Sequence, residues 1–140
     1  ACLLPSTIAH ELAHQRGVAA ELEANFVGVM AATAGGNAAY QYSGWLFGYL
    51  HLSNALYSAD PDLARASYAA LCAEAQADMA DNNAYWKQWE GPVKETGEKV
   101  YTAFLQGYGQ ELGMRSYGAC VDLLVEEFLP YTPTGGLTAE

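Results

Sequence analysis

The stretch IAHELAHQRGVAAELEANF, residues 8–26, contains two histidines, a glycine and three glutamates in a pattern typical of a helical metal site. His10 and His14 are four residues apart, so on a helix both imidazoles lie on one face, one turn apart, and can bind one ion. Glu11 follows His10 directly and lies beside that row, which suits a general base better than a ligand. Zn²⁺ is the ion favoured by two imidazoles and a carboxylate.

A catalytic zinc needs a third protein ligand, and the acids after Gly17 are the nearest candidates. Gly17 allows a sharp turn, after which a second helix contains Glu21 and Glu23. Residues two apart on a helix point about 200° apart, so we expect only one acid to bind: Glu21, with Glu23 as the alternative. Asn25 shares the face of Glu21, where it is expected to hydrogen-bond a ligand. Charge at a helix N-terminus is the ordinary alternative role of both acids.

Helix signals recur along the chain, and we find no segment with the alternation of a strand. In the last helix, Val121, Leu124, Val125 and Phe128 share one face, which predicts that this face is buried. Asp60 and Pro61 suit the cap and first residue of a helix. Helices are expected between Pro5 and Gly17 and at about residues 19–33, 37–57, 61–81, 93–112 and 116–129, with a break or a short irregular helix at 82–92.

These elements predict an all-α, compact multi-helix domain over residues 1–129, with the HELAH helix near its N-terminus, and a loose tail at 130–140. Residues 24–59 contain no Asp, Glu, Lys or Arg. We expect this segment to form two buried helices; its aromatic part, YQYSGWLFGYL at 40–50, leaves membrane contact as the alternative. His51 falls in this segment and is expected to be a hydrogen-bonded core histidine rather than a third ligand.

Composition narrows the class of partner. The 140 residues are 51% hydrophobic, enough for one domain with a core, and carry a formal net charge of −10. Nucleic acid and anionic membrane surfaces are disfavoured as partners, because both need a Lys/Arg footprint. Cys2, Cys72 and Cys120 form no CxxC pair, which indicates small buried side chains or a free thiol.

HELAH followed by ELEAN resembles the glutamate-zincins, the thermolysin-like metallopeptidases, and that resemblance implies Glu21 as the third ligand. HELAHQRG, EANF, YSGWL, NALY and SYGACVDLL together resemble a bacterial family named domain of unknown function 3810. This second resemblance implies a zinc metallopeptidase domain of a longer protein of the bacterial cell membrane, with transmembrane helices ahead of it. It also implies that the edge strand that aligns substrates lies outside this zincin-like helical part.

Peptide-bond hydrolysis is the leading hypothesis: His10, His14 and Glu21 would hold Zn²⁺, and Glu11 would activate the bound water against a peptide or protein substrate. Tyr42 and Tyr117 are outside candidates for stabilising the oxyanion, although packing is the ordinary role for most of ten tyrosines. The competing hypothesis is a non-catalytic helical binding or structural module whose zinc site is degenerate or incomplete.

Overall fold

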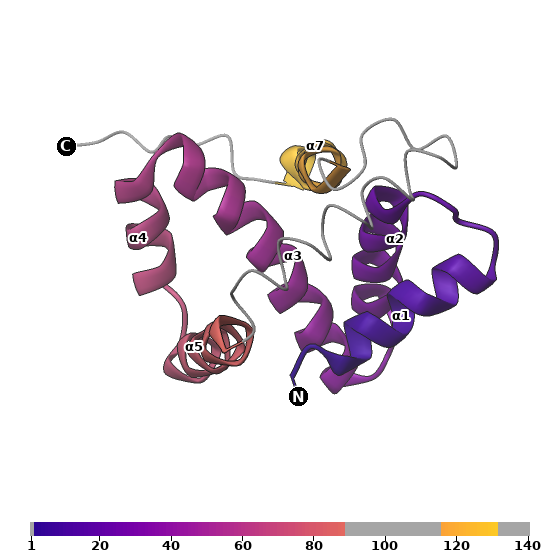
Figure 1. Ribbon diagram of the computed structural model, residues 1–140, viewed down its shortest axis with the longest axis horizontal. Helices are drawn as coiled ribbons and strands as arrows, with labels where there is room; N and C mark the ends of the chain where they lie inside the picture. Colours follow the sequence, from indigo (N-terminus) through magenta and orange to yellow (C-terminus); the bar gives the residue numbers. More distant parts are fainter. Residues whose placement is uncertain (1, 89–115, 132–140) are drawn as a thin grey trace.

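The computed structural model describes residues 2–88 and 116–131 and is helical, without strands, over these two ranges (Figure 1). This confirms the predicted all-α class. In chain order the elements are α1 (Leu4–Gln15), α2 (Glu21–Ala34), α3 (Ala38–Ala59), α4 (Pro61–Ala69), α5 (Ala73–Lys87), α7 (Ser116–Phe128) and a 3₁₀ turn, η2 (Leu129–Tyr131).

Helix α3 crosses the middle of the molecule and packs against α1, α2, α4 and α7 (Figure 1). Small residues let α2 and α3 approach closely. A Cβ built on Gly44 would lie 2.8 Å from Cγ2 of Thr33 and 3.0 Å from Cβ of Ala32. The close packing of α2 and α3 therefore needs glycine at position 44. Helix α1 packs against both of these helices.

A buried serine pair joins α1 to α3. Ser43 Oγ accepts the backbone N–H of Ser6 at 3.0 Å, and the two hydroxyl oxygens lie 2.8 Å apart. The N–H groups of the first helical turn have no partner within the helix, so Ser43 satisfies one of them from the neighbouring element. Both serines are fully buried, and this contact positions the start of the histidine helix on the core.

The expected helix starts are largely confirmed. Asn37 caps α3, accepting the backbone N–H of Ala39 at 2.9 Å. Asp60 caps α4 through the N–H of Leu63 at 3.0 Å, with Pro61 as the first helical residue. The side-chain oxygens of Asn37 and Asp60 thus accept N–H groups of the first turn, and α3 and α4 start where the sequence indicates.

The expectation of one helix over 61–81 is wrong, because the helix is interrupted between the end of α4 at Ala69 and the start of α5 at Ala73. Cys72 is extended, with φ −63° and ψ 157°. The Gln76 side chain donates to the carbonyl of Leu71 at 2.9 Å, and Ala75 and Met79 pack on Leu46 of α3. The packing of Ala75 and Met79 with Leu46 stabilises the change of direction between α4 and α5. This packing outweighs the helix propensity of the residues between the two helices. Helix α5 then continues to Lys87, so a break beginning at 82 is also wrong.

In α7 the buried face is displaced from the one expected. Leu124 and Cys120 are fully buried and Phe128 is partly buried, whereas Val125 is 46% exposed. The expected helix at 93–112, and the tail from 132 onward, lie outside the described residues.

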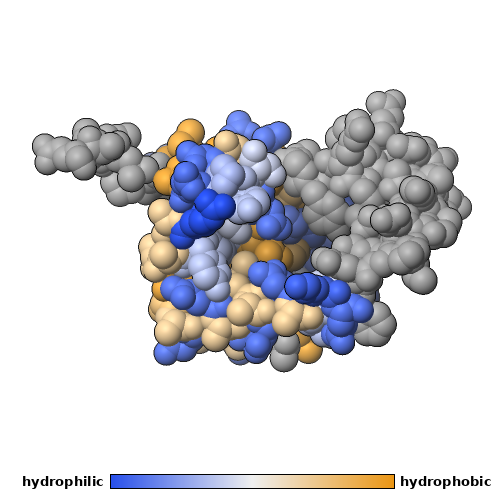
Figure 2. Space-filling view, turned by 60° about the vertical axis from the view of Figure 1, so that its left-hand side comes forward, coloured by the Kyte–Doolittle hydropathy of each residue, from blue (hydrophilic) through white to orange (hydrophobic). Residues whose placement is uncertain are grey.

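The segment free of charged residues contributes to both core clusters, but one side of α3 remains at the surface. Val29 and Ala32 of α2 are buried, as is Leu46 of α3, whereas Trp45 is 54% and Tyr57 55% exposed. Figure 2 shows such a mixed surface, with hydrophilic residues over much of the visible face and apolar residues set back near its centre. Among the described helices, none is both long and apolar enough to cross a membrane.

Candidate metal centre

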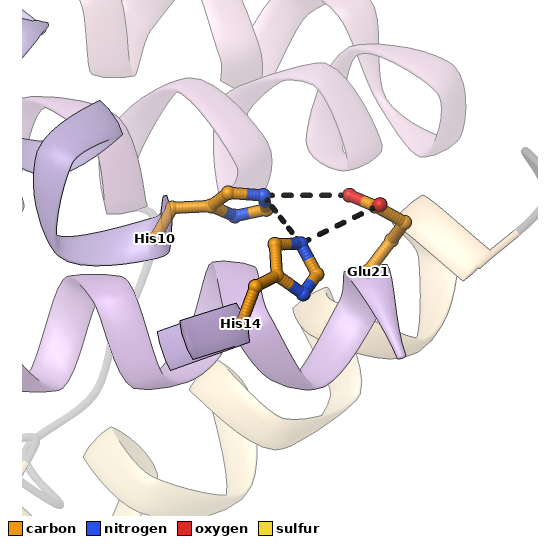
Figure 3. A group of neighbouring side chains, drawn as sticks. All are labelled: His10, His14 and Glu21. Carbon is orange, nitrogen blue, oxygen red and sulfur yellow. Dashed lines mark hydrogen bonds and ion pairs between the residues drawn. The ribbon is translucent and has the colours of Figure 1, made fainter. Parts of the chain in front are cut away.

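His10, His14 and Glu21 point toward one another at the junction of α1 and α2 (Figure 3). The Nε2 atoms of the two histidines lie 3.1 Å apart. Glu21 Oε2 lies 3.4 Å from His10 Nε2, and Oε1 lies 3.5 Å from His14 Nε2. Within residues 2–88 and 116–131, this is the one group of three or more His, Cys, Asp or Glu side chains close enough to hold a metal ion.

The spacing of these atoms fits a tetrahedral ion. Zinc binds nitrogen and oxygen at about 2.0–2.1 Å, so two ligands at a tetrahedral angle lie about 3.3–3.4 Å apart. The two nitrogens lie 3.1 Å apart, close to that value, and they lie 3.4 and 3.5 Å from two different oxygens of the Glu21 carboxylate. With one ligand atom taken from each residue, all three atoms lie within 4.8 Å of one another. Two imidazoles and one carboxylate are also a donor set that zinc accepts while leaving a fourth position for water. The group could therefore hold a metal ion without large movement of either helix.

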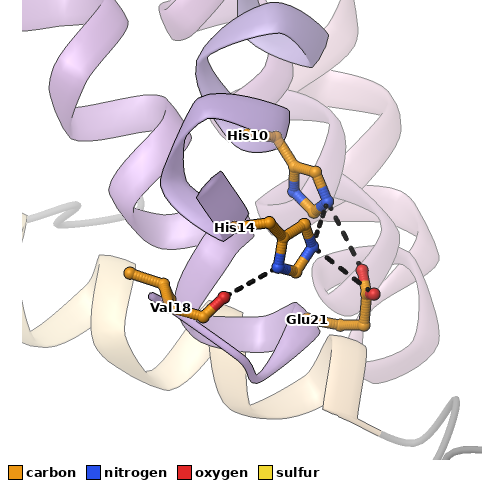
Figure 4. A network of polar contacts seen from close by, with 4 residues as sticks. All are labelled: His10, His14, Val18 and Glu21. Carbon is orange, nitrogen blue, oxygen red and sulfur yellow. Dashed lines mark hydrogen bonds and ion pairs between the residues drawn. The ribbon is translucent and has the colours of Figure 1, made fainter. Parts of the chain in front are cut away.

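The imidazole of His14 is oriented by the backbone (Figure 4). Its Nδ1 lies 2.7 Å from the carbonyl oxygen of Val18. A carbonyl only accepts hydrogen bonds, so Nδ1 carries the hydrogen, and in the neutral ring Nε2 presents its lone pair. This contact directs Nε2, the atom beside Glu21, toward a metal. A hydrogen bond from the second nitrogen to a carbonyl is the usual support of a metal-binding histidine.

Gly17 produces the turn that brings Val18 and Glu21 back to the histidines. It has φ +99°, a left-handed conformation that a residue with a Cβ rarely adopts. The turn is closed by hydrogen bonds from the N–H of Gly17 to the carbonyl of His14 at 3.0 Å and from Val18 to Ala13 at 3.1 Å. Helix α2 begins at Glu21, four residues after Gly17. The three side chains are therefore close in sequence although they come from two helices.

His10 is held differently from His14. Its Nδ1 is buried and has no hydrogen-bond partner in the described part of the chain. The side chain of His10 is 14% exposed, against 26% for His14 and 23% for Glu21. The group is therefore partly open to solvent, and the orientation of His10 depends on packing rather than on a hydrogen bond at its second nitrogen.

His51 is a buried residue of α3, as expected of a core histidine, and does not belong to the group. Its ring meets that of Phe47 edge-on, with centroids 4.6 Å apart. Burial, and secondly the charge of nearby His10, lower the pKa of His51 below its ordinary value. The lowered pKa favours the neutral form of the side chain.

The other predicted site residues, Glu11, Glu23 and Asn25, differ in their exposure to solvent. Glu11 and Glu23 are exposed, and Glu23 lies outside the group. Glu11 follows His10 on α1, and its exposed side chain is accessible to water. Asn25 is 5% exposed and lies one turn after Glu21, as the helical spacing requires. A hydrogen bond from Asn25 to a ligand stays a prediction.

The two tyrosine candidates differ in what the structure describes. The Tyr42 hydroxyl donates to Asp78 Oδ2 of α5 at 2.6 Å. This hydrogen bond, followed by burial, raises the pKa of Tyr42 above its ordinary value. The hydroxyl is therefore engaged by α5 and not by α1. The side chain of Tyr117 lies outside the described residues, so a role for it stays a prediction.

The cysteines follow the simple expectation of free side chains. Cys2, Cys72 and Cys120 are unpaired with one another. Cys120 is fully buried beside Val29 and Leu124, and burial raises the pKa of its thiol to about 11. It acts as a small apolar residue of the core and takes no part in the metal group.

Two features of this site left no side-chain signal in the sequence. The carbonyl of Val18 supports His14, but any residue carries a carbonyl, so Val18 is not distinguished by its type. Gly28 lies against the backbone of His10, and only the packing of α2 on α1 identifies it. Gly17, by contrast, was found from sequence because a glycine directly after a helix is a recognisable stop signal.

Comparison with known proteins gives one family. No curated protein and no solved structure is significantly similar to the chain. A family model matches residues 1–125, a range that includes the histidine helix, the Gly17 turn and most of α7. Through this match the chain belongs to the family described as protein of unknown function (DUF3810).

Proposed function

We propose that this domain is a zinc-dependent hydrolase of peptide bonds, with His10, His14 and Glu21 as the protein ligands and Glu11 as the general base. The observation that carries the proposal is that the two Nε2 atoms, 3.1 Å apart, face the Glu21 carboxylate, whose Oε2 lies 3.4 Å from His10 and whose Oε1 lies 3.5 Å from His14. The neighbouring Glu11 separates this proposal from a purely structural metal site, because such sites usually have four protein ligands and no free base.

Each residue of the site has a separate chemical task. Bound zinc would lower the pKa of a coordinated water and polarise the carbonyl of the substrate. The Glu11 carboxylate would accept a proton from the attacking water and then donate it to the departing amine nitrogen. Val18 keeps the lone pair of His14 directed at the site, and Glu21 offsets positive charge there. Partial exposure of the group leaves room for a peptide to approach.

Metal binding is the first test. Protein purified without chelator is expected to contain close to one zinc per chain by elemental analysis, and the His10→Ala, His14→Ala double variant is expected to contain none. Zinc retained by the double variant would mean that it binds elsewhere, for example at Cys72, and would contradict the proposed site.

The role of Glu11 is tested by Glu11→Gln, which keeps the size of the side chain and removes the base. We expect the variant to retain zinc and to lose at least about 100-fold in peptide hydrolysis, the lower range of a general-base contribution. Cleavage of a quenched fluorescent peptide library measures the rate. Glu74→Gln, at an exposed acid of α5, is the matched control and should leave the rate unchanged.

The two outcomes of this experiment separate the competing functions. Equal hydrolysis by the wild type and Glu11→Gln would reject the proposed base. Stoichiometric zinc without any hydrolysis by the wild-type chain would instead support a non-catalytic helical module that binds metal.

A further inference from the structure

Gly28 is the residue at which α2 touches the backbone of His10. It is buried on α2, and a Cβ built there would lie 3.2 Å from the backbone nitrogen of His10, 3.3 Å from its Cα and 3.4 Å from its Cβ. The first two distances are shorter than an ordinary contact of 3.4–4 Å, so α1 would have to give by a few tenths of an ångström. The absence of a side chain at Gly28 therefore permits the observed separation of the two helices at His10.

Gly28 and Glu21 lie on the same face of α2. They are seven residues apart, which is two helical turns and a rotation within about 20° of full register. The face of α2 that touches His10 at Gly28 is thus the face that presents the Glu21 carboxylate to the His10 imidazole, 3.4 Å away. A change in the distance between α1 and α2 at Gly28 would move that carboxylate relative to His10.

This contact matters more for His10 than a similar contact would for His14. The His14 ring is oriented by the Val18 carbonyl, whereas the buried Nδ1 of His10 has no hydrogen-bond partner within the described ranges. The main chain of His10 is also unable to rotate away from a new Cβ, because it lies within α1. Relief would have to come from a shift of α1 against α2.

We propose that Gly28 is a positioning residue of the metal centre, whose missing side chain sets the distance between the His10 imidazole and the Glu21 carboxylate. The inference rests on the proposed metal site and adds a residue that makes no contact with the ion. It concerns ligand spacing only, so it holds whether or not the bound ion supports hydrolysis.

Gly28→Ala is expected to weaken zinc binding by about tenfold, within the range of about 10–100-fold seen when the supporting residues of metal ligands are changed. An ordinary glycine in the middle of a helix gives the opposite expectation. Its replacement by alanine would raise helix stability and leave metal affinity unchanged. A positioning role predicts weaker zinc binding and an ordinary helical glycine predicts unchanged zinc binding, so the substitution discriminates between the two roles.

Two glycines of the same chain are matched controls. A Cβ on Gly48 of α3 would lie 3.4 Å from a methyl group of Val29, a side chain next to Gly28 in sequence, and a Cβ on Gly36 would have no atom within 4 Å. Gly48→Ala adds a methyl group in ordinary contact with Val29 of α2 and away from α1, and Gly36→Ala adds one with no atom within 4 Å. Both variants should bind zinc as the wild type does.

The experiment compares the zinc dissociation constants of the wild type, Gly28→Ala, Gly48→Ala and Gly36→Ala by competition with a chromophoric chelator. The visible spectrum of bound Co²⁺ gives a second measure, which reports ligand geometry and does not respond to global stability. If Gly28→Ala is poorly folded without metal, zinc-dependent melting yields its affinity, because an ion that binds only the native state raises the melting temperature.

A tenfold loss confined to Gly28→Ala, with an altered Co²⁺ spectrum, supports the proposal. Wild-type affinity and spectrum in Gly28→Ala would overturn it while leaving the proposed function intact, and so would equal losses in Gly28→Ala and Gly48→Ala. A wild-type chain that binds neither Zn²⁺ nor Co²⁺ would overturn the proposed function and this inference together.

Discussion

At the scale of single residues, Glu21 and Glu23 show how two similar acids acquire different surroundings. Both lie in the first turn of α2, where a negative charge favours the helix dipole. Glu21 turns toward α1 and approaches both Nε2 atoms, whereas Glu23 is exposed to solvent. The rotation of about 200° between them, combined with the direction from which α1 approaches, separates a candidate ligand from a surface charge.

Glu21→Gln and Glu23→Gln, measured separately, identify the third ligand. We expect Glu21→Gln to weaken zinc binding by more than about 100-fold, because loss of a ligand should exceed the usual effect of its supporting residues. Glu23→Gln should change the affinity less than about threefold, since an exposed charge near the site is screened by solvent. Isothermal titration with Zn²⁺ measures both values. The reverse order of effects would make Glu23 the ligand and Glu21 the surface acid.

At the scale of elements, the position of α1 depends on how it is joined to α3 and α2. The contact with α3 is polar, through the buried Ser6 and Ser43, and the contact with α2 is close, at Gly28 against the backbone of His10. Small side chains on both helices allow the short separation that the metal group needs. The buried hydroxyl pair adds a directional contact, which defines the register of α1 along α3.

Ser43→Ala is expected to destabilise the domain more than Ser6→Ala. Removing the Ser43 hydroxyl leaves the Ser6 N–H and hydroxyl unsatisfied in the core, at a cost of about 1–3 kcal/mol. In Ser6→Ala the backbone N–H at position 6 keeps its bond to Ser43. Urea unfolding of the two variants and of the double variant gives the free energies of unfolding and their coupling.

The control for this cycle is Ser58→Ala, at an exposed serine whose hydroxyl donates to the carbonyl of Asn54 within the same helix. A surface change of this kind should alter the free energy of unfolding by less than about 0.5 kcal/mol. Equal costs for Ser6→Ala and Ser43→Ala would mean that the backbone N–H of residue 6 contributes little to the contact.

At the scale of the whole molecule, the metal group links the first two helices of a larger helical arrangement. Helix α1 packs on α2 and α3, and α2 packs on α7 as well. The central cluster of Val29, Cys120 and Leu124 joins α2 to α7 across more than 90 residues of sequence. An ion at the α1–α2 junction should therefore stabilise the folded domain as a whole, because it binds a group assembled only in the native state.

Zinc at about 100 times its dissociation constant should stabilise the folded chain by about 2.7 kcal/mol. For a chain of this length that corresponds to a rise in melting temperature on the order of 10 °C. Differential scanning fluorimetry with zinc, and then with excess chelator, measures the shift and its reversal. The His10→Ala, His14→Ala double variant should show no shift. A shift of equal size in that variant would place the stabilising zinc outside the proposed site.

The sequence alone was sufficient for the features that depend on neighbours along the chain. The four-residue spacing of His10 and His14, the stop at Gly17 and the cap at Asp60 are local, so the pattern predicts them. It did not predict the break before α5, because the alanines and Leu71 there favour a helix and the packing of Ala75 and Met79 with Leu46 of α3 is a tertiary contact. It also misplaced the buried face of α7, because that face depends on where α2 lies.

For the candidate site, the residue types were readable from HELAH and ELEAN, since two histidines on one helical face and a nearby acid are properties of spacing. The tertiary structure decided whether the side chains of His10, His14 and Glu21 come together. The two imidazoles and the carboxylate come together because Gly17 reverses the chain and Gly28 lets α2 lie against the backbone of His10. The separation of two helices is a property of the side chains packed between them, and no periodicity within either helix specifies it.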